Sequence, residues 1–302
     1  MSNLRKKFDI ILPIVKDALK YYLNEKGNIP KKGKKPTFSD AEVITLSLLS
    51  ECVMIDSENY LFALIKNEYS HDFPNIIDRT VYNRRRKSLF GYIEMVRQYL
   101  SQRLIEGENI FIIDSMPLEI CKFSRAKRIS ICQDESETAP AFGYCAAQDS
   151  TYFGYKLHCV ISTSGVISSF DLSKANVADI HYLQDIRHRY QNCILLGDRA
   201  YLSNPVQQEL FEDSNLLLNT PMRKNQANFH NQPAIFRRVR KRIETMYSQF
   251  CDYLAIRKNY AKKFLGLAIR ILSKITGFTL MQFLNKFYYD KKLNHVKHTL
   301  LV

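Results

Sequence analysis

The chain has 302 residues, of which 46% are hydrophobic and 25% charged, and its formal net charge is +14. This composition is typical of a soluble globular protein, and the length allows two domains or one domain with large additions. Seven scattered cysteines without a CxxC pair argue against a disulfide framework or a zinc site. No uncharged apolar run reaches the ~20 residues that span a bilayer, so we expect a cytoplasmic protein without a membrane partner.

The charge is unevenly distributed along the chain. Residues 1–100 carry +5, residues 101–220 carry −5 and residues 221–302 carry +14. An acidic middle segment between basic flanks favours a polyanion held near a cation site.

The first third of the chain has helical patterns. Apolar spacing predicts a helix over residues 5–26, and Ser39 followed by Glu42 predicts a capping box at the start of a second helix. A third helix is expected over residues 59–67. A longer helix follows the basic segment 79–87, because it has a buried stripe formed by Leu89, Ile93, Val96 and Leu100.

The pattern changes to alternating strands and helices after residue 106. The expected elements are strands at 109–121, 151–161, 166–172, 194–197 and 216–218, and helices at 178–190, 205–211 and 235–256, with a further helix through Leu267, Ile271, Ile275 and Phe278. This order predicts an α/β domain with a mixed central sheet. We therefore divide the chain into an all-helical region 1–105, an α/β region 106–260 and a helical extension 261–302.

Three acidic residues occupy positions suited to a metal-dependent nuclease. Asp114 and Asp198 each end an apolar run, and Glu244 lies in a basic helical stretch. Strand ends of an α/β sheet converge, so two such carboxylates and one from a helix can bridge two cations ~3.5–4 Å apart. The simpler alternatives are a turn or cap role for each Asp and an i, i+4 ion pair between Glu244 and Arg240.

Short motifs in a specific order extend this interpretation. They are Thr80–Arg86, Ile112–Pro117, Ile131–Ser136, Gly154–His158, Leu196–Tyr201 and Arg240–Glu244. Together they resemble the DDE transposases of bacterial insertion sequences, and in particular the insertion sequence 982 family. The resemblance covers about residues 10–290.

The resemblance implies a ribonuclease-H-like catalytic core in which Asp114, Asp198 and Glu244 hold two Mg²⁺ ions, for which Mn²⁺ can substitute. It implies nicking of double-stranded DNA at terminal inverted repeats, then strand transfer to target DNA by a homodimer. Related groups have a Tyr, Arg, Glu, Lys signature around the last acid. Arg240 and Glu244 match it, whereas Arg237 stands at the Tyr position and Cys251 at the Lys position.

The same interpretation assigns DNA contacts. The helix start near residue 79 is the expected end-recognition element, because Arg can read guanine and Asn adenine in the major groove. Its residues are Arg79, Asn83, Arg84, Arg85 and Arg86. Non-specific phosphate binding is the alternative for each Arg. Further DNA contacts are expected from Lys156, Arg199 and Arg240.

Other polar residues compete for these roles. Asp171 ends a strand and is the strongest rival ligand, while Asp179 and Asp185 fall on a predicted helix where capping and surface roles dominate. His158 is expected to form a structural hydrogen bond, and Tyr201 to be a buried support for its loop. Two other functions stay open: a nuclease without strand transfer, and a catalytically inactive or domesticated DNA-binding protein.

Overall fold

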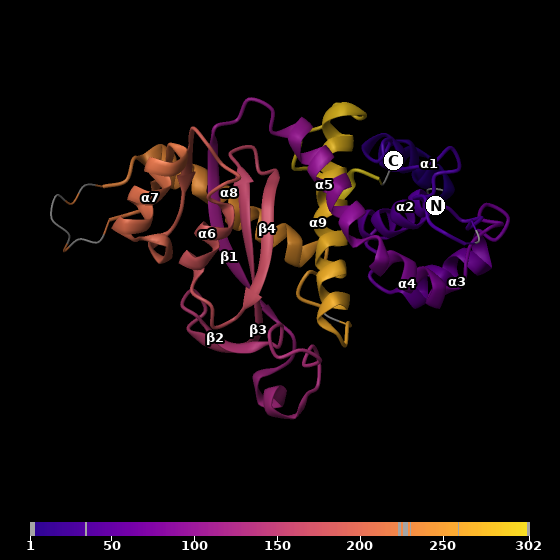
Figure 1. Ribbon diagram of the computed structural model, residues 1–302, viewed down its shortest axis with the longest axis horizontal. Helices are drawn as coiled ribbons and strands as arrows, with labels where there is room; N and C mark the ends of the chain where they lie inside the picture. Colours follow the sequence, from indigo (N-terminus) through magenta and orange to yellow (C-terminus); the bar gives the residue numbers. More distant parts are fainter. Residues whose placement is uncertain are drawn as a thin grey trace. The chain divides into compact units, whose positions relative to one another are not determined.

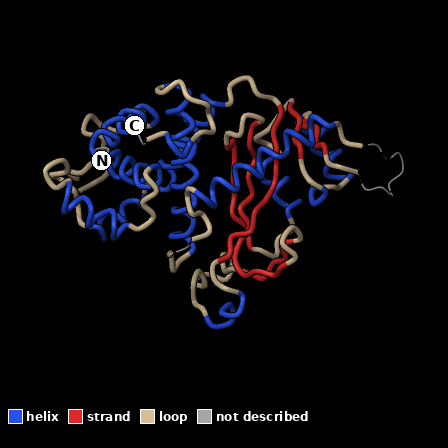
Figure 2. The backbone as a smooth tube through the Cα atoms, turned by 180° about the vertical axis from the view of Figure 1, so that it is seen from behind, coloured by secondary structure: helices blue, strands red, loops and turns tan. Residues whose placement is uncertain are grey.

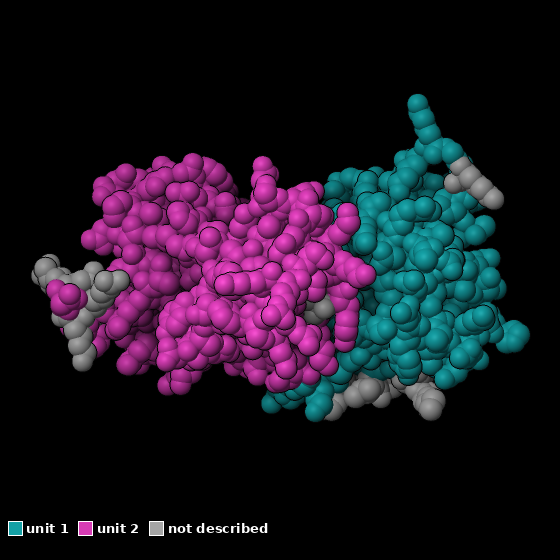
Figure 3. Space-filling view, turned by 90° about the horizontal axis from the view of Figure 1, so that it is seen from below, with its two compact units in different colours: residues 1–104, 253–255, 265–302 teal, residues 105–252, 256–264 magenta. Residues whose placement is uncertain are grey.

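A computed structural model describes residues 4–33, 35–222, 225, 229, 231–258 and 260–300. The chain forms two compact units, which Figure 3 colours separately. Unit 1 comprises residues 1–104, 253–255 and 265–302, and unit 2 comprises residues 105–252 and 256–264.

Unit 1 is helical in its described part. Its helices are α1 (Leu4–Ala18), α2 (Asp40–Cys52), α3 (Glu58–Glu68), α4 (Arg79–Ser88), α5 (Phe90–Leu104), α9 (Phe264–Phe287) and the 3₁₀ turn η4 (Val296–His298). The predicted capping box is confirmed at α2, because the Ser39 side chain accepts from the Glu42 amide while the Glu42 carboxylate accepts from the Ser39 amide. Helix α1 contains Pro13 and ends at Ala18, earlier than predicted.

Helix α9 is the apolar core of unit 1. It is long and apolar enough to cross a membrane by length and composition, but 83% of its most apolar window is buried inside the structure. Gly277 allows close approach to α2, since a Cβ there would lie 2.9 Å from the Cβ of Glu51. The ammonium of Lys274 is buried beside Glu51 and Asp56, at 3.0 and 2.9 Å from their carboxylate oxygens. These buried ion pairs are typical of a core helix rather than of a lipid-facing one.

Unit 2 is built on a six-stranded mixed sheet (Figure 1). Its strands are β1 (Ile110–Glu119), β2 (Ala141–Cys145), β3 (Ser150–Ser162), β4 (Ile167–Lys174), β5 (Cys193–Leu196) and β6 (Leu216–Asn219). The order is β2-β3-β1-β5-β6, with β4 also paired to β3. Strand β1 is antiparallel to β3 and parallel to β5, and β5 is parallel to β6. The predicted mixed sheet is therefore confirmed.

Helices flank this sheet. They are α6 (Tyr182–Ile186), α7 (Asn204–Ser214) and α8 (Ala234–Asp252), with 3₁₀ turns η1 (Phe123–Arg128), η2 (Asp179–His181) and η3 (Arg199–Tyr201). Phe111 and Ile113 of β1 belong to one buried cluster with residues of α6 and α7. Helix α8 packs against β1 and crosses the strands in Figure 2.

Two local predictions differ from the structure. The expected helix over 178–190 is limited to η2 and the five-residue α6, and the sequence did not predict strand β2. Strand β2 pairs only with β3, and its side chains alternate between partly exposed and exposed. Phe142 and Tyr144 alternate with smaller residues in this strand, but both aromatic side chains are exposed, so the alternation does not mark a buried face.

Candidate active site

The register of two parallel strands brings Asp114 and Asp198 to matched positions just beyond the segment over which β1 and β5 pair. Ile112 of β1 pairs with Leu196 of β5, and each acid follows two residues later. Neighbouring strands lie about 4.8 Å apart, so residues that leave adjacent parallel strands at matched positions are neighbours. The two carboxylates interact electrostatically. Asp198 follows the end of β5 as predicted, whereas Asp114 lies within β1, which continues to Glu119.

The turn after β5 fixes the position of Asp198. The side chain of Asp198 accepts a hydrogen bond from the Ala200 amide at 2.8 Å and caps the 3₁₀ turn η3. A Cβ on Gly197 would lie 3.3 Å from both Ile113 and Tyr201, so glycine suits the close packing there. Asp198 therefore has the cap role that the sequence allowed, and it also lies beside Asp114.

Asp114 has an unusual acidity. Its pKa rises from 3.8 to about 7, mainly because burial disfavours the charged carboxylate and also because of the negative charges of Asp198 and Asp179. The Ser115 amide, which donates to Asp114 Oδ1 at 2.8 Å, and the charge of Arg240 oppose this rise in pKa. A bound cation favours the charged form of a carboxylate whose pKa is raised by burial and neighbouring negative charges.

Helix α8 meets β1 at Asp114. The hydroxyl of Tyr247 donates to the backbone carbonyl of Asp114 at 2.8 Å, and Arg240 acts electrostatically on the Asp114 carboxylate. Glu244 lies between these two residues at the i+4 position from Arg240, so the three share one helix face. Glu244 is exposed. The i, i+4 spacing allows an ion pair between Glu244 and Arg240, but the described part of the chain does not form it.

The donor chemistry of Asp114 and Asp198 fits a hard divalent cation, because both offer carboxylate oxygens and their charges repel. In the part of the chain that the structure describes, no three His, Cys, Asp or Glu side chains are arranged to hold a metal ion. Of the three predicted ligands, Asp114 and Asp198 lie close together, and Glu244 lies on helix α8, which packs against β1.

Other predicted contacts have their partners inside unit 2. The ammonium of Lys156 donates to Val177 O at 2.8 Å and to Asp179 Oδ1 at 3.1 Å. His158 Nε2 lies 2.7 Å from Ser173 Oγ, as expected for a structural hydrogen bond. Arg199 is exposed. Asp171, the rival ligand, interacts with Asp185 and Arg189.

Sequence reasoning missed Asp179. It lies in η2 and reaches the side chains of Ser115 and Lys156, and its charge acts on Asp114. The only signal for it in the sequence was its position just after the predicted hairpin, where a cap or surface role was the simpler interpretation.

Most of the predicted recognition residues on α4 bind other residues of unit 1. Arg85 contacts Asp40 at 2.7 Å, the buried Arg86 contacts Glu58 at 2.8 Å, and Asn83 donates to both Glu58 oxygens. Arg79 lies 4.0 Å from Glu58, and Arg84 is exposed. DNA binding by these residues stays a prediction. Arg84 is the one that can reach DNA without breaking a described contact.

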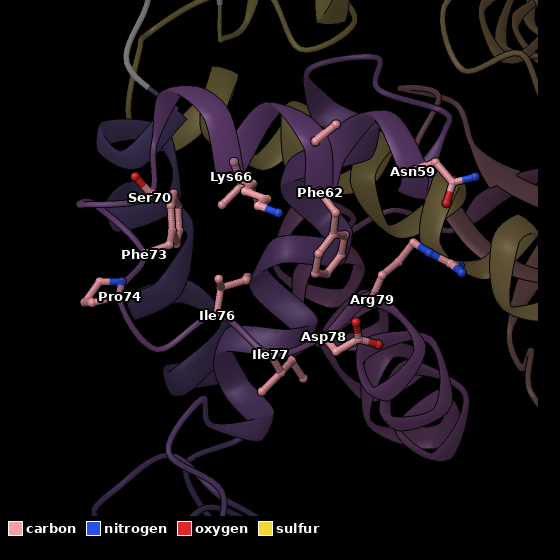
Figure 4. Close-up of a pocket in the computed structure, with 12 residues that line it drawn as sticks. Asn59, Phe62, Lys66, Ser70, Phe73, Pro74, Ile76, Ile77, Asp78 and Arg79 are labelled. Atoms are coloured by element: carbon pink, nitrogen blue, oxygen red, sulfur yellow. The ribbon is translucent and has the colours of Figure 1, made fainter.

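A hollow of about 580 Å³ lies beside α3 and the start of α4. Figure 4 shows Phe62 and Ile76 at its wall, with Lys66 and Arg79 among its polar lining residues. Neither Asp114 nor any other proposed acid lines this hollow, so it is separate from the carboxylate pair.

Comparison with protein families adds an independent finding. A family model described as a transposase DDE domain matches residues 105–279, more than half of the chain. The chain therefore belongs to the transposase DDE domain family, and its mixed sheet flanked by helices is compatible with a ribonuclease-H-like core. No curated protein and no solved structure matched the chain.

Proposed function

We propose that the chain is an insertion-sequence transposase of the 982 family, which binds terminal inverted repeats, nicks DNA there and transfers the freed 3′-hydroxyl to target DNA. Asp114, Asp198 and Glu244 are the proposed ligands of two Mg²⁺ or Mn²⁺ ions. The observation that carries the proposal is the position of Asp114 beside Asp198, just beyond the paired segment of the parallel strands β1 and β5, where helix α8 packs against β1.

The arrangement of α8 supports a role for Glu244. Arg240 and Tyr247 both act on Asp114, one through its carboxylate and the other through its carbonyl. Glu244 lies between them on the same helix face, and we propose that a change of its side-chain rotamer directs it toward the acids. Divalent cations bound there would activate the attacking water or hydroxyl and stabilise the leaving oxygen.

The first half of α8 supports DNA as the substrate. Five cationic residues fall within 237–242, and none of them is in an ion pair with another described residue. They are Arg237, Arg238, Arg240, Lys241 and Arg242. The apolar face of α8 that unit 2 buries begins only at Ile243. An unpaired cationic helix next to a carboxylate pair suits phosphate binding beside a cation site.

The proposal also covers finer features. Unit 1 is the proposed recognition region, with Arg84 and Arg79 of α4 at the inverted repeat. Lys156 and Arg199 are proposed phosphate contacts, and Lys156 must then exchange its bond to Asp179 for one to DNA. Two copies of the chain would join the two ends of the element. The protein would act in the bacterial cytoplasm, on the nucleoid.

The test uses the full chain and a DNA duplex carrying the repeats that flank its gene. We expect nicking that requires Mg²⁺ or Mn²⁺, and strand transfer from a pre-cleaved 3′-hydroxyl end. Asp114→Asn, Asp198→Asn and Glu244→Gln should each abolish nicking but leave DNA binding intact. The matched control is Asp185→Asn. Asp185 is an exposed acid of the same unit, and its charge acts on Asp171, which is not one of the three proposed ligands. Unchanged nicking in any of the three variants would refute that residue's role.

A catalytically inactive DNA-binding protein is the second candidate. It is favoured by one observation, namely that no three potential ligands among the described residues are arranged around one point. This candidate predicts tight, salt-sensitive DNA binding without cleavage under any divalent ion. Nicking by the wild-type chain excludes it.

A further inference from the structure

A fourth acidic side chain, Asp179, lies within the proposed active site. Ser115 Oγ donates to Asp179 Oδ1 at 2.9 Å, Lys156 Nζ donates to the same oxygen at 3.1 Å, and His158 Nδ1 lies 3.9 Å from it. Only 18% of the Asp179 side chain is exposed. These contacts join the start of η2 to strands β1 and β3, so Asp179 connects three elements that surround the acids.

Ser115 links Asp179 to Asp114 directly. Its backbone amide donates to Asp114 Oδ1 at 2.8 Å, while its hydroxyl donates to Asp179 Oδ1. One residue therefore bonds both carboxylates through different groups. Because the hydroxyl bond fixes Ser115, it also restricts the amide that orients the Asp114 carboxylate.

Lys156 is the main counter-charge of Asp179. Only 15% of the Lys156 side chain is exposed. Its other described acceptor is the carbonyl of Val177, two residues before Asp179. Loss of the Asp179 charge would leave the poorly hydrated Lys156 ammonium without its paired anion. Pairing with another nearby carboxylate would then lower the free energy of the ammonium. Asp114 and Asp198 are the acids of the same site.

Two buried polar atoms face this cluster without a hydrogen-bond partner. They are Tyr201 Oη and His158 Nδ1, and each residue is 1% exposed. The pKa of Tyr201 is raised well above its usual value, first by burial and then by the charges of Asp179, Asp114 and Asp198. The phenol is therefore close to all three acids, which makes the cluster a built polar site rather than a solvated surface patch.

We propose that Asp179 is a positioning residue of the active site, which holds Ser115 and neutralises Lys156 so that the Asp114 carboxylate stays oriented and available for a divalent cation. This inference rests on the proposed function. Asp179 is assigned to the shell around the ligands, and not to the ligands, because its Oδ1 already accepts hydrogen bonds from Ser115 Oγ and Lys156 Nζ. Residues that support ligands in this way change metal affinity or activity 10–100-fold when mutated.

The experiment measures nicking against Mn²⁺ concentration for the wild type, Asp179→Asn and Ser115→Ala, with Asp185→Asn as the matched control. We expect Asp179→Asn and Ser115→Ala to raise the half-maximal Mn²⁺ concentration by about 10–100-fold. The control should follow the wild-type curve. A purely structural role would lower the amount of folded enzyme without moving this concentration, and thermal unfolding of each variant measures that separately.

A double-mutant cycle tests the role of Lys156. If Asp179 neutralises Lys156, the pair Asp179→Asn and Lys156→Gln should lose less activity than the sum of the single losses. Wild-type Mn²⁺ dependence in both Asp179→Asn and Ser115→Ala would overturn the inference, as would full additivity in the cycle. Absence of nicking by the wild type under every divalent ion would instead refute the proposed function.

Discussion

The raised pKa of Asp114 predicts that this residue destabilises the fold at neutral and alkaline pH when no cation is bound. Its pKa is about 7 in the folded chain against an ordinary value of 3.8, chiefly because of burial and then because of Asp198 and Asp179. A pKa difference of about 3 corresponds to about 4 kcal/mol. Because Asp114 is partly exposed, we expect Asp114→Asn to raise the free energy of unfolding by about 2–4 kcal/mol at pH 8.

The sign of the pH dependence follows from proton binding. Between pH 4 and 7 the folded chain holds a proton on Asp114 that the unfolded chain has lost, so stability falls as the pH rises through this window. Below pH 4 both states are protonated and the contribution vanishes. The stability difference between Asp114→Asn and the wild type should therefore be near zero at pH 4 and reach its maximum above pH 7.

Urea denaturation in a chelator, from pH 4 to 8, measures this difference. The matched control Asp185→Asn should show a much smaller pH-dependent change, because Asp185 is exposed and its charge acts on Asp171 rather than on Asp114. Saturating Mn²⁺ should then stabilise the wild type at pH 8, by about 2.7 kcal/mol at one hundred times the dissociation constant, but stabilise Asp114→Asn much less. A constant difference between the two chains across the whole pH range would refute the argument from burial and neighbouring charge.

Three further predictions concern other parts of the chain. Lys274→Met should cost about 3–5 kcal/mol in urea denaturation because it leaves the buried Glu51 unpaired, and adding Glu51→Gln should recover part of the loss. Arg84→Ala should reduce the slope of log affinity for DNA against log salt concentration by about 0.9 without changing the stability of the fold, because Arg84 is exposed. Arg86→Ala should instead destabilise unit 1, because Arg86 pairs with Glu58. Equal salt slopes for Arg84→Ala and the wild type would exclude a phosphate contact of Arg84. Tyr201→Phe should raise the cation-free unfolding free energy by about 1–3 kcal/mol in chemical denaturation, because it removes a buried hydroxyl without a partner, and a loss of stability would show that the hydroxyl is satisfied.

Local sequence patterns predicted the features that depend on neighbouring residues. The capping box at Ser39 and Glu42, the hairpin of β3 and β4, and the apolar runs ending at Asp114 and Asp198 are all encoded within a few residues. The order of strands and helices predicted the mixed sheet, but the parallel register of β1 and β5, which brings Asp114 beside Asp198, comes from the structure.

Pairings between distant residues could not be predicted in the same way. The basic start of α4 has the sequence of a DNA-reading helix, yet Arg86 is buried against Glu58 and Arg85 against Asp40. The sequence spacing does not distinguish an arginine that pairs with a carboxylate of the same chain from one that is free to bind a phosphate. The role of Asp179 is hidden for the same reason, because its partner Ser115 is 64 residues away along the chain.

Unit 2 has two groups of charges with different proposed roles, the acidic centre around Asp114 and the cations of the first half of α8. When Asp114 is ionised, Asp114, Asp198 and Asp179 together place three negative charges beside the positive charges of Lys156 and Arg240. A phosphodiester that entered this centre would add another negative charge, so under the proposed function the centre would need a divalent cation before it could accept DNA. The cations of the first half of α8 would attract DNA over a longer range, and salt would screen that attraction. Added salt should therefore weaken DNA binding by the chain, whereas removal of divalent cations should stop nicking while α8 still holds DNA.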